Sequence, residues 1–190
     1  VEAYVGKYAK ISAEGQNAAN NIYLGDLDAN GQATRTDAKG VFVSATSSEK
    51  LLTIAVAGSM GSVGVAASAV ANVIKETTLA HINEGAIVKA TNSNQADDLG
   101  PSVYVTATDY TDIFGLGGSL TAGAGLGAGA GADIGQMTKN TRAVVAEGVK
   151  MQAEDCILIR ARSDGNILSI AAGVGFASGI GLGLSASVYI

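Results

Sequence analysis

The clearest chemical motif lies between residues 26 and 37, where oxygen donors recur at the spacing of a calcium loop. Alternating carboxylates can converge on one hard cation, Gly31 permits the sharp turn, and Gln32 would offer its backbone carbonyl. We therefore predict a structural Ca²⁺ site. Its ligands would be Asp26, Asp28, Asn30, Gln32 and Asp37.

The same motif departs from a complete calcium loop at two positions. Asp37 stands where a bidentate Glu is usual, Ala33 replaces a larger aliphatic anchor, and no amphipathic helix flanks the segment. An affinity of about 0.1 to 1 mM is expected for such a loop. The alternative is a solvated turn, because Asp, Asn and Gly favour turns without any metal.

The remaining polar residues give little indication of a catalytic site. His81 is the only histidine and has no evident acid or base partner in the sequence. The acids Asp97, Asp98, Asp109 and Asp112 could belong to a β-helical hydrolase or lyase site, but exposed acids are the usual case. We expect no enzyme and no catalytic residue. The lone cysteine, Cys156, is expected to be a buried, inert thiol.

Three blocks of sequence recur in a fixed order, which is typical of stacked repeats. A Val-x-Val-x-Ala block spans 41–46, 103–108 and 157–162, and an Ala-x-(Val/Ile) block spans 3–13, 80–90 and 143–153. A third block begins at Leu52, Leu120 and Leu168. Gap-free blocks with unequal spacers predict strands in register with loops between them. We expect Val43, Val105 and Ile159 to be stacked neighbours that face the core. We expect one β-solenoid segment over 1–190, with repeat units near 1–50, 51–118 and 119–190 and an insertion loop at 14–40.

The long Gly- and Ala-rich runs alternate large and small residues with period two. Over 168–190 the even positions are mostly aliphatic and the odd positions mostly Gly or Ser. This alternation predicts a strand with one bare face and disfavours the transmembrane helix that an uncharged run of this length also permits. A glycine face indicates close approach of another backbone. We expect each run to fold back on itself, in the first copy at 58–62.

The wording of residues 52–88, LTIAVAGSMGSVGVAASAVANVIKETTLAHINEGAIV, resembles the repeat region of large bacterial surface and secreted exoproteins. These are the filamentous-haemagglutinin and leukotoxin-type adhesins. The resemblance implies an all-β fold, a parallel β-helix or β-solenoid. It also implies an extracellular or cell-surface location and adhesion to a protein or glycan on a host or neighbouring cell.

The net charge and the phase of the repeat limit the classes of partner that the chain is expected to bind. A net charge of −5 and the lack of a basic stripe disfavour nucleic acid. Neither membrane insertion nor a further cofactor is expected. The chain begins and ends at nearly the same phase of the repeat, so end-to-end stacking into filaments is predicted. The alternative is a β-helical carbohydrate-active enzyme or carbohydrate-binding module.

Overall fold

The computed structural model describes residues 1–15, 17–28, 30, 32–92 and 100–190. Over these residues the chain is built from β-strands, and no helix long and apolar enough to cross a membrane occurs among them. The strands are β1 (Glu2–Val5), β2 (Lys10–Ala13), β3 (Ala19–Leu27), β4 (Ala33–Ala38), β5 (Gly40–Ile82), β6 (Ile87–Ala90), β7 (Ser102–Val145), β8 (Lys150–Ala153), β9 (Ile157–Ala177) and β10 (Ile180–Tyr189).

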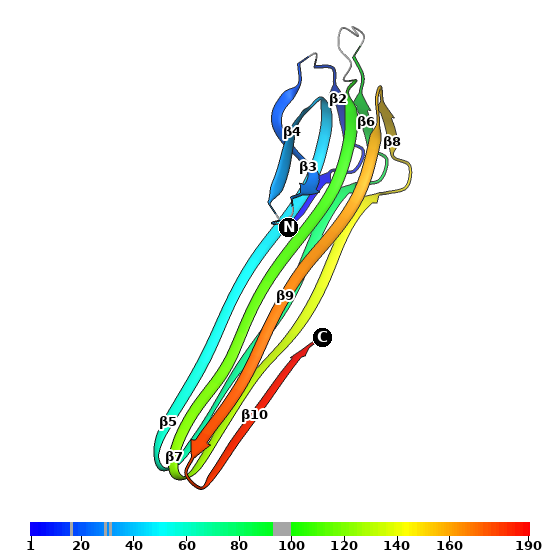
Figure 1. Cartoon of the computed structure of the whole chain (residues 1–190). Coiled ribbons are helices and arrows are strands. Elements are labelled where there is room, and N and C mark those ends of the chain that lie inside the picture. The colour runs from blue at the N-terminus through cyan, green and yellow to red at the C-terminus, as the bar shows by residue number, and fades with distance from the viewer. Residues whose placement is uncertain (16, 29, 31, 93–99) are drawn as a thin grey trace. The chain divides into compact units, whose positions relative to one another are not determined.

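The strands form three sheets distributed over two compact units. Unit 1 comprises 1–48, 76–110 and 140–164, and unit 2 comprises 49–75, 111–139 and 165–190. The largest sheet has the order β1-β5-β7-β10 with β9 beside β7, the second has the order β2-β6-β8, and β3 and β4 form a hairpin (Figure 1). The predicted all-β class is confirmed, and the β-solenoid stays a prediction.

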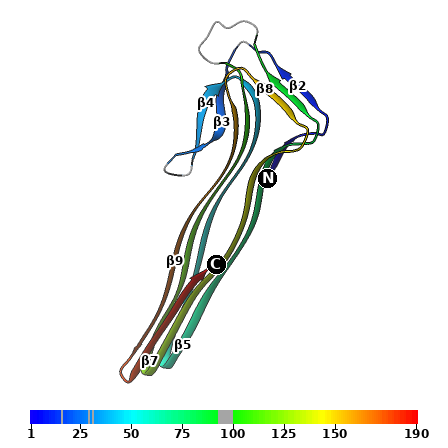
Figure 2. The ribbon, with the colours of Figure 1, turned by 90° about the vertical axis from the view of Figure 1, so that its right-hand side faces the viewer.

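The short repeat block supplies the register of two parallel sheets in unit 1. Ala3 lies opposite Ala80 between β1 and β5, and the rings of Tyr4 and His81 follow at 5.4 Å. Ile11, Val88 and Met151 lie opposite one another across β2, β6 and β8, which lie side by side in Figure 2. These are the pairs that the gap-free sequence blocks align, so the predicted register is confirmed here.

The Val-x-Val-x-Ala block is also in register. Phe42 stacks on Tyr104 at 5.3 Å, and Thr106 Oγ1 donates to Ser44 Oγ at 3.1 Å, 62 residues away. Val43 and Val105 are buried as predicted. Ile159 is 46% exposed, because β9 pairs with β7 on one side and no strand among the described residues lies on its other side.

The third block is out of register, which corrects its predicted alignment. Thr53 Oγ1 donates to the carbonyl of Phe114 at 3.5 Å, whereas the repeated wording aligned Leu52 with Leu120. Because the strand continues without interruption from the Val-x-Val-x-Ala block, the residue offset between neighbouring copies in that block also holds here. The sequence that begins at Leu120 therefore resembles the one at Leu52 in composition, but the two do not occupy equivalent positions in the ladder.

Aliphatic side chains fill the interior of unit 1. Val and Ile from the stacked strands are enclosed between the sheets, and partly buried residues of β2 and β8 pack against them. The buried cluster is Val5, Val41, Val43, Ala45, Ala80, Ile82, Ala86, Val88, Ala90, Val103, Val105 and Ala107. This core resembles that of an ordinary β protein, because large apolar residues point inward.

Unit 2 is organised in the opposite way. Its three segments each run out and reverse, giving an outgoing layer (49–60, 111–122, 165–177) and a return layer (63–75, 126–139, 180–190) (Figure 1). A Cβ placed on Gly173 would lie 2.1 Å from the carbonyl oxygen of Leu184, and one on Gly175 would lie 2.3 Å from that of Leu182. The glycine faces of the two layers therefore meet, as predicted.

Candidate functional site

The predicted calcium ligands are distributed along the β3–β4 hairpin in unit 1. The antiparallel pairing places Ile22 opposite Thr36 and Leu27 opposite Ala33, so the turn follows Leu27. Gly31, the predicted turn glycine, lies outside the described residues. Each remaining ligand can be located from its own hydrogen bonds.

Three of the five residues meet in the turn. Asp28 Oδ1 accepts the backbone N–H groups of Asn30 and Gln32, each at 2.8 Å, while the Asp28 N–H donates to the Gln32 carbonyl at 2.9 Å. This carboxylate-closed turn is the arrangement expected of an Asx turn. It also collects the oxygens of Asp28 and Gln32 at one place.

The other two residues have different partners. Asp26 Oδ1 lies 3.0 Å from Arg160 Nη2, and Asp37 Oδ1 accepts the N–H of Asn21 at 3.1 Å. Asp37 is four residues beyond Ala33, which in a strand amounts to roughly 13 Å. The hairpin thus brings Asp28, Asn30 and Gln32 together and does not bring Asp37 to them.

The hairpin is clamped onto the neighbouring strands β7 and β9. Arg160 Nη2 donates to the Leu24 carbonyl at 2.8 Å, and Thr108 Oγ1 donates to the Gly25 carbonyl at 3.2 Å. Gly25 has a φ of 91°, and an added Cβ would lie 3.0 Å from Thr108 Oγ1. Burial under the clamp raises the pKa of Tyr23.

This clamp was missed in the sequence, although a signal for it exists. Arg160 occupies the repeat position held by Ser44 and Thr106 in the other copies. A guanidinium in place of a small hydroxyl marks the copy that reaches out to another segment. The insertion is thereby held on the second copy by Thr108 and on the third copy by Arg160.

Calcium binding is the first testable prediction. Titration calorimetry of the intact chain should reveal a site with a dissociation constant of about 0.1 to 1 mM. The double variant Asp26→Ala, Asp28→Ala should lose it, because both carboxylates leave the turn region. Identical heats for the two proteins would contradict a calcium site.

The variant Asp37→Asn serves as the matched control. It removes one carboxylate of the motif at the end of the hairpin that is distant from the turn. Unchanged affinity would place the ion in the turn, bound without the carboxylate of Asp37. Loss of binding would mean that the hairpin rearranges to bring Asp37 to the ion.

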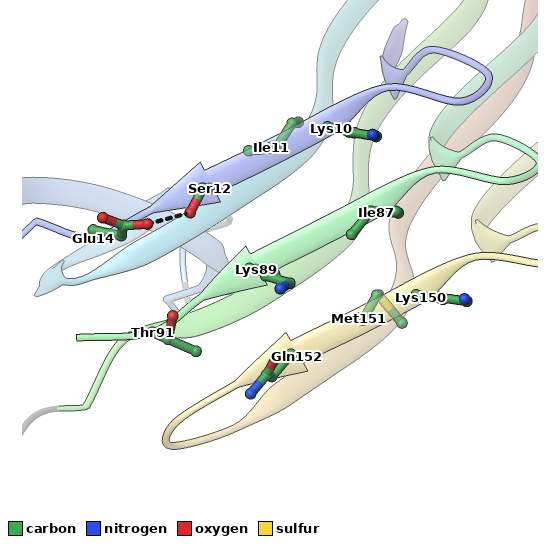
Figure 3. A pocket seen from close by; sticks show the side chains of 10 residues that line it. All are labelled: Lys10, Ile11, Ser12, Glu14, Ile87, Lys89, Thr91, Lys150, Met151 and Gln152. Carbon is green, nitrogen blue, oxygen red and sulfur yellow. Dashed lines mark hydrogen bonds between the residues drawn. The ribbon is translucent and has the colours of Figure 1, made fainter. Parts of the chain in front are cut away.

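A second candidate surface is a shallow groove on the outer face of the β2-β6-β8 sheet. It has a volume of about 710 Å³, and Figure 3 shows lysine side chains from all three strands along it. The register places Lys10, Ile87 and Lys150 in one row and Ser12, Lys89 and Gln152 in the next. Strand spacing separates the backbones of Lys10 and Lys150 by roughly 10 Å.

The groove concentrates positive charge in an acidic protein. Lys10, Lys89 and Lys150 are exposed and form no ion pair with any residue that the structure describes. Glu14 lies in the groove as well, where it accepts a hydrogen bond from Ser12 Oγ at 2.8 Å. Three uncompensated ammonium groups on one face favour a negatively charged partner.

The other polar residues singled out in the sequence have identified partners where the structure describes them. His81 Nε2 lies 2.8 Å from Glu2 Oε1, a partner that the sequence did not suggest because the two are 79 residues apart. Asp109 is fully buried and accepts from Thr141 Oγ1 at 3.3 Å. Asp112 Oδ1 accepts from Asn166 Nδ2 at 3.4 Å. Asp97 and Asp98 lie outside the described residues.

Cys156 corrects another prediction. It is exposed, whereas a buried thiol was expected. Its Sγ donates to Ser102 Oγ at 3.4 Å and lies 3.9 Å from the Tyr104 hydroxyl. The residue precedes β9, which pairs with β7 on one side only, so no strand in the described part of the chain covers the sulfur.

Comparison of the chain with protein-family models, with curated proteins and with solved structures finds no match.

Proposed function

We propose that this chain is a non-enzymatic, structural and adhesive repeat segment of a bacterial cell-surface or secreted exoprotein, built as a β-solenoid. The observation that carries the proposal is the register. Residues repeated in the sequence lie opposite one another in parallel strands, as at Ala3 and Ala80 or at Ile11, Val88 and Met151. Such a ladder can grow by adding copies and needs no active site.

Open strand edges support growth by stacking. In unit 2 the strand order β5-β7-β10 leaves β5 at one border and β10 at the other, and the described residues place no strand outside either. Unpaired N–H and C=O groups at such borders favour pairing with another copy. End-to-end stacking would satisfy both borders at once.

A tandem chain tests the stacking. Ile190 N–H donates to Gly135 O in the ladder, Asn72 Nδ2 reaches the Tyr189 hydroxyl, and the carbonyl of Val1 accepts from Leu79 N–H. Ile190 therefore takes the place of Val73 and Val1 the place of Thr78, so two copies joined by residues 74–77 continue in phase. We expect its melting temperature to exceed that of the single chain by several degrees, measured by circular dichroism.

The control tandem carries one extra glycine in the same linker. A one-residue slip turns every side chain to the other face of its sheet, so the second copy cannot continue the ladder. Its melting temperature should match that of the single chain. Equal melting of both tandem proteins would contradict stacking in register.

The adhesive contact is assigned to the lysine groove of the β2-β6-β8 sheet, with a negatively charged protein or glycan as ligand. Beads coated with the chain should bind cultured epithelial cells. The triple variant Lys10→Ala, Lys89→Ala, Lys150→Ala should bind about tenfold more weakly, because three exposed charge contacts of modest energy are lost together. Added salt should weaken binding of the original chain more than that of the variant.

The control variant removes the same number of charges elsewhere: Lys7→Ala, Lys50→Ala, Lys75→Ala. Equal loss by both triple variants would attribute adhesion to net charge and not to the groove. Binding that neither variant changes would remove the groove from the proposal.

A further inference from the structure

The outer faces of unit 2 carry large apolar side chains, which is the reverse of the usual arrangement. On the outgoing layer the exposed residues include Leu52, Ile54 and Val56, the last of them 71% exposed. On the return layer they include Val65 and Leu184, the latter 70% exposed. The inner faces are mostly glycine, alanine and small polar residues, with Val70 and Ile113 as buried exceptions, so most of the large apolar surface of unit 2 lies outside.

Both faces are also free of charge over the same length. Between Lys50 and Lys75 the first segment has no charged residue, and 165–190 has none at all. In the middle segment the only charge from 113 to 138 is Asp133, which is fully buried between the layers. The uncharged band is about ten residues long, or roughly 33 Å.

Lipid is a poor occupant for this band. Within unit 2 the outer borders of β5, β9 and β10 pair with no strand that the structure describes. Each unsatisfied backbone group costs several kcal/mol in hydrocarbon, and two bare borders would place many such groups there. A protein surface that covers the faces leaves the borders free to be hydrated or paired.

The two faces differ in relief in a complementary way. On the outgoing face the middle strand β7 carries a ridge of large side chains, namely Phe114 and Leu116, which are half-buried, and Leu120, which is 56% exposed. On the return face the same strand carries alanines between Leu126 and Ile134, in a groove of about 500 Å³ lined by Ala67, Ala69, Ala130, Ala132, Leu184 and Ala186. The central strand therefore carries large side chains on the outgoing face and small side chains on the return face.

We propose that the outgoing face of unit 2 in one copy packs against the return face of unit 2 in a second copy. Three strands about 4.8 Å apart and ten residues of about 3.3 Å rise give a face of roughly 470 Å². Two such faces bury roughly 950 Å², which is near the lower limit of specific interfaces. The contact is heterologous, so it leaves one face of each copy open to a third.

A crosslinking experiment distinguishes this lateral contact from end-to-end stacking. In a Cys156→Ser background, one protein carries Leu116→Cys on the ridge and the other Ala130→Cys in the groove. Mixed under oxidising conditions, they should form a disulfide-linked dimer, because the two Cβ atoms can approach to about 4 Å only when the faces meet. Copies that pair through strand borders keep these positions on opposite layers and should give no such dimer.

Charge variants supply the second arm. Ile54→Glu blocks the outgoing face and Leu184→Glu blocks the return face, so neither protein should self-associate laterally in sedimentation velocity. An equimolar mixture should form a one-to-one dimer, because one intact face of each kind remains. Ser48→Glu, on an exposed position outside the band, should associate as the original chain does.

Three results would overturn the proposal. One is the absence of the Leu116→Cys, Ala130→Cys crosslink in proteins whose circular dichroism matches the original chain. Another is a mixture of the charge variants that stays monomeric. The third is cosedimentation of the original chain with phosphatidylcholine vesicles that is lost in both charge variants, which would make lipid the occupant.

Discussion

Replacing Gly175 by alanine is expected to destabilise the protein by about 3 kcal/mol, an effect at the upper end for overpacking. The new Cβ would lie 2.3 Å from the carbonyl oxygens of both Gly127 and Leu182, which belong to β7 and β10 in the opposite, return layer. Both obstacles are backbone, so no side chain can rotate away. Urea denaturation followed by circular dichroism measures the loss.

Gly118→Ala is the matched control for this substitution. Gly118 lies in the same layer, but its Cβ would have only the carbonyl of Ala172 nearby, at 3.9 Å. Alanine there should be neutral or should stabilise by about 0.4 to 1 kcal/mol, because it restricts the unfolded chain. A cost at Gly175 no greater than that at Gly118 would mean that the two layers are not in contact.

The second large effect is expected at Asp133, the buried carboxylate between the layers of unit 2. Ser169 Oγ donates to Asp133 Oδ2 at 2.5 Å, and the Tyr189 hydroxyl lies 3.3 Å from Oδ1. Asn72 Nδ2 in turn donates to the Tyr189 oxygen at 3.0 Å. Burial raises the pKa of Tyr189, so its hydroxyl stays protonated as a donor at neutral pH.

Asp133→Ala should cost about 3 kcal/mol, because the partly buried hydroxyls of Ser169 and Tyr189 would lose this acceptor. Asp133→Asn should cost about 1 kcal/mol or less, since the amide oxygen still accepts and the shape is kept. The comparison separates lost hydrogen bonds from lost volume. Equal stability of the two variants would show that the network contributes little.

Much of the fold could be predicted from the sequence because neighbouring strands have similar sequences. In-register ladders place like residues together, so aligning Ile11 with Val88 already states their pairing. The glycine alternation similarly predicts the contact between layers, since only a bare face admits a second backbone at that distance. These inferences depend on local periodicity, which a single sequence displays.

The errors have a different origin. Cys156 and Ile159 were expected inside, but burial depends on whether a further strand lies beside the last copy, and periodicity does not specify that. The contacts of the hairpin were not predicted either, because Arg160 joins Asp26 and Leu24, which lie 134 and 136 positions away in the sequence. Long-range contacts of an insertion have no repeat to reveal them.

The candidate sites were only partly within reach of sequence reasoning. The calcium motif was recognised from its spacing, but strand pairing and not spacing decides that Asp37 lies at the far end of the hairpin. The lysine groove had no sequence signature, because its residues come from separate copies and different phases of the repeat. Once the register is known, Lys10 and Lys150 are seen to share a row.

The sequence spacing of equivalent residues determines how far each copy extends the ladder. Ser44 and Thr106 are neighbours although 62 residues separate them, and 54 residues separate Asp112 from Asn166. Each copy thus advances the ladder by one strand spacing, about 4.8 Å, a rise that an α-helix attains with about three residues. A ladder made of such copies therefore grows perpendicular to its strands, by about 4.8 Å for every 54 to 62 residues of chain.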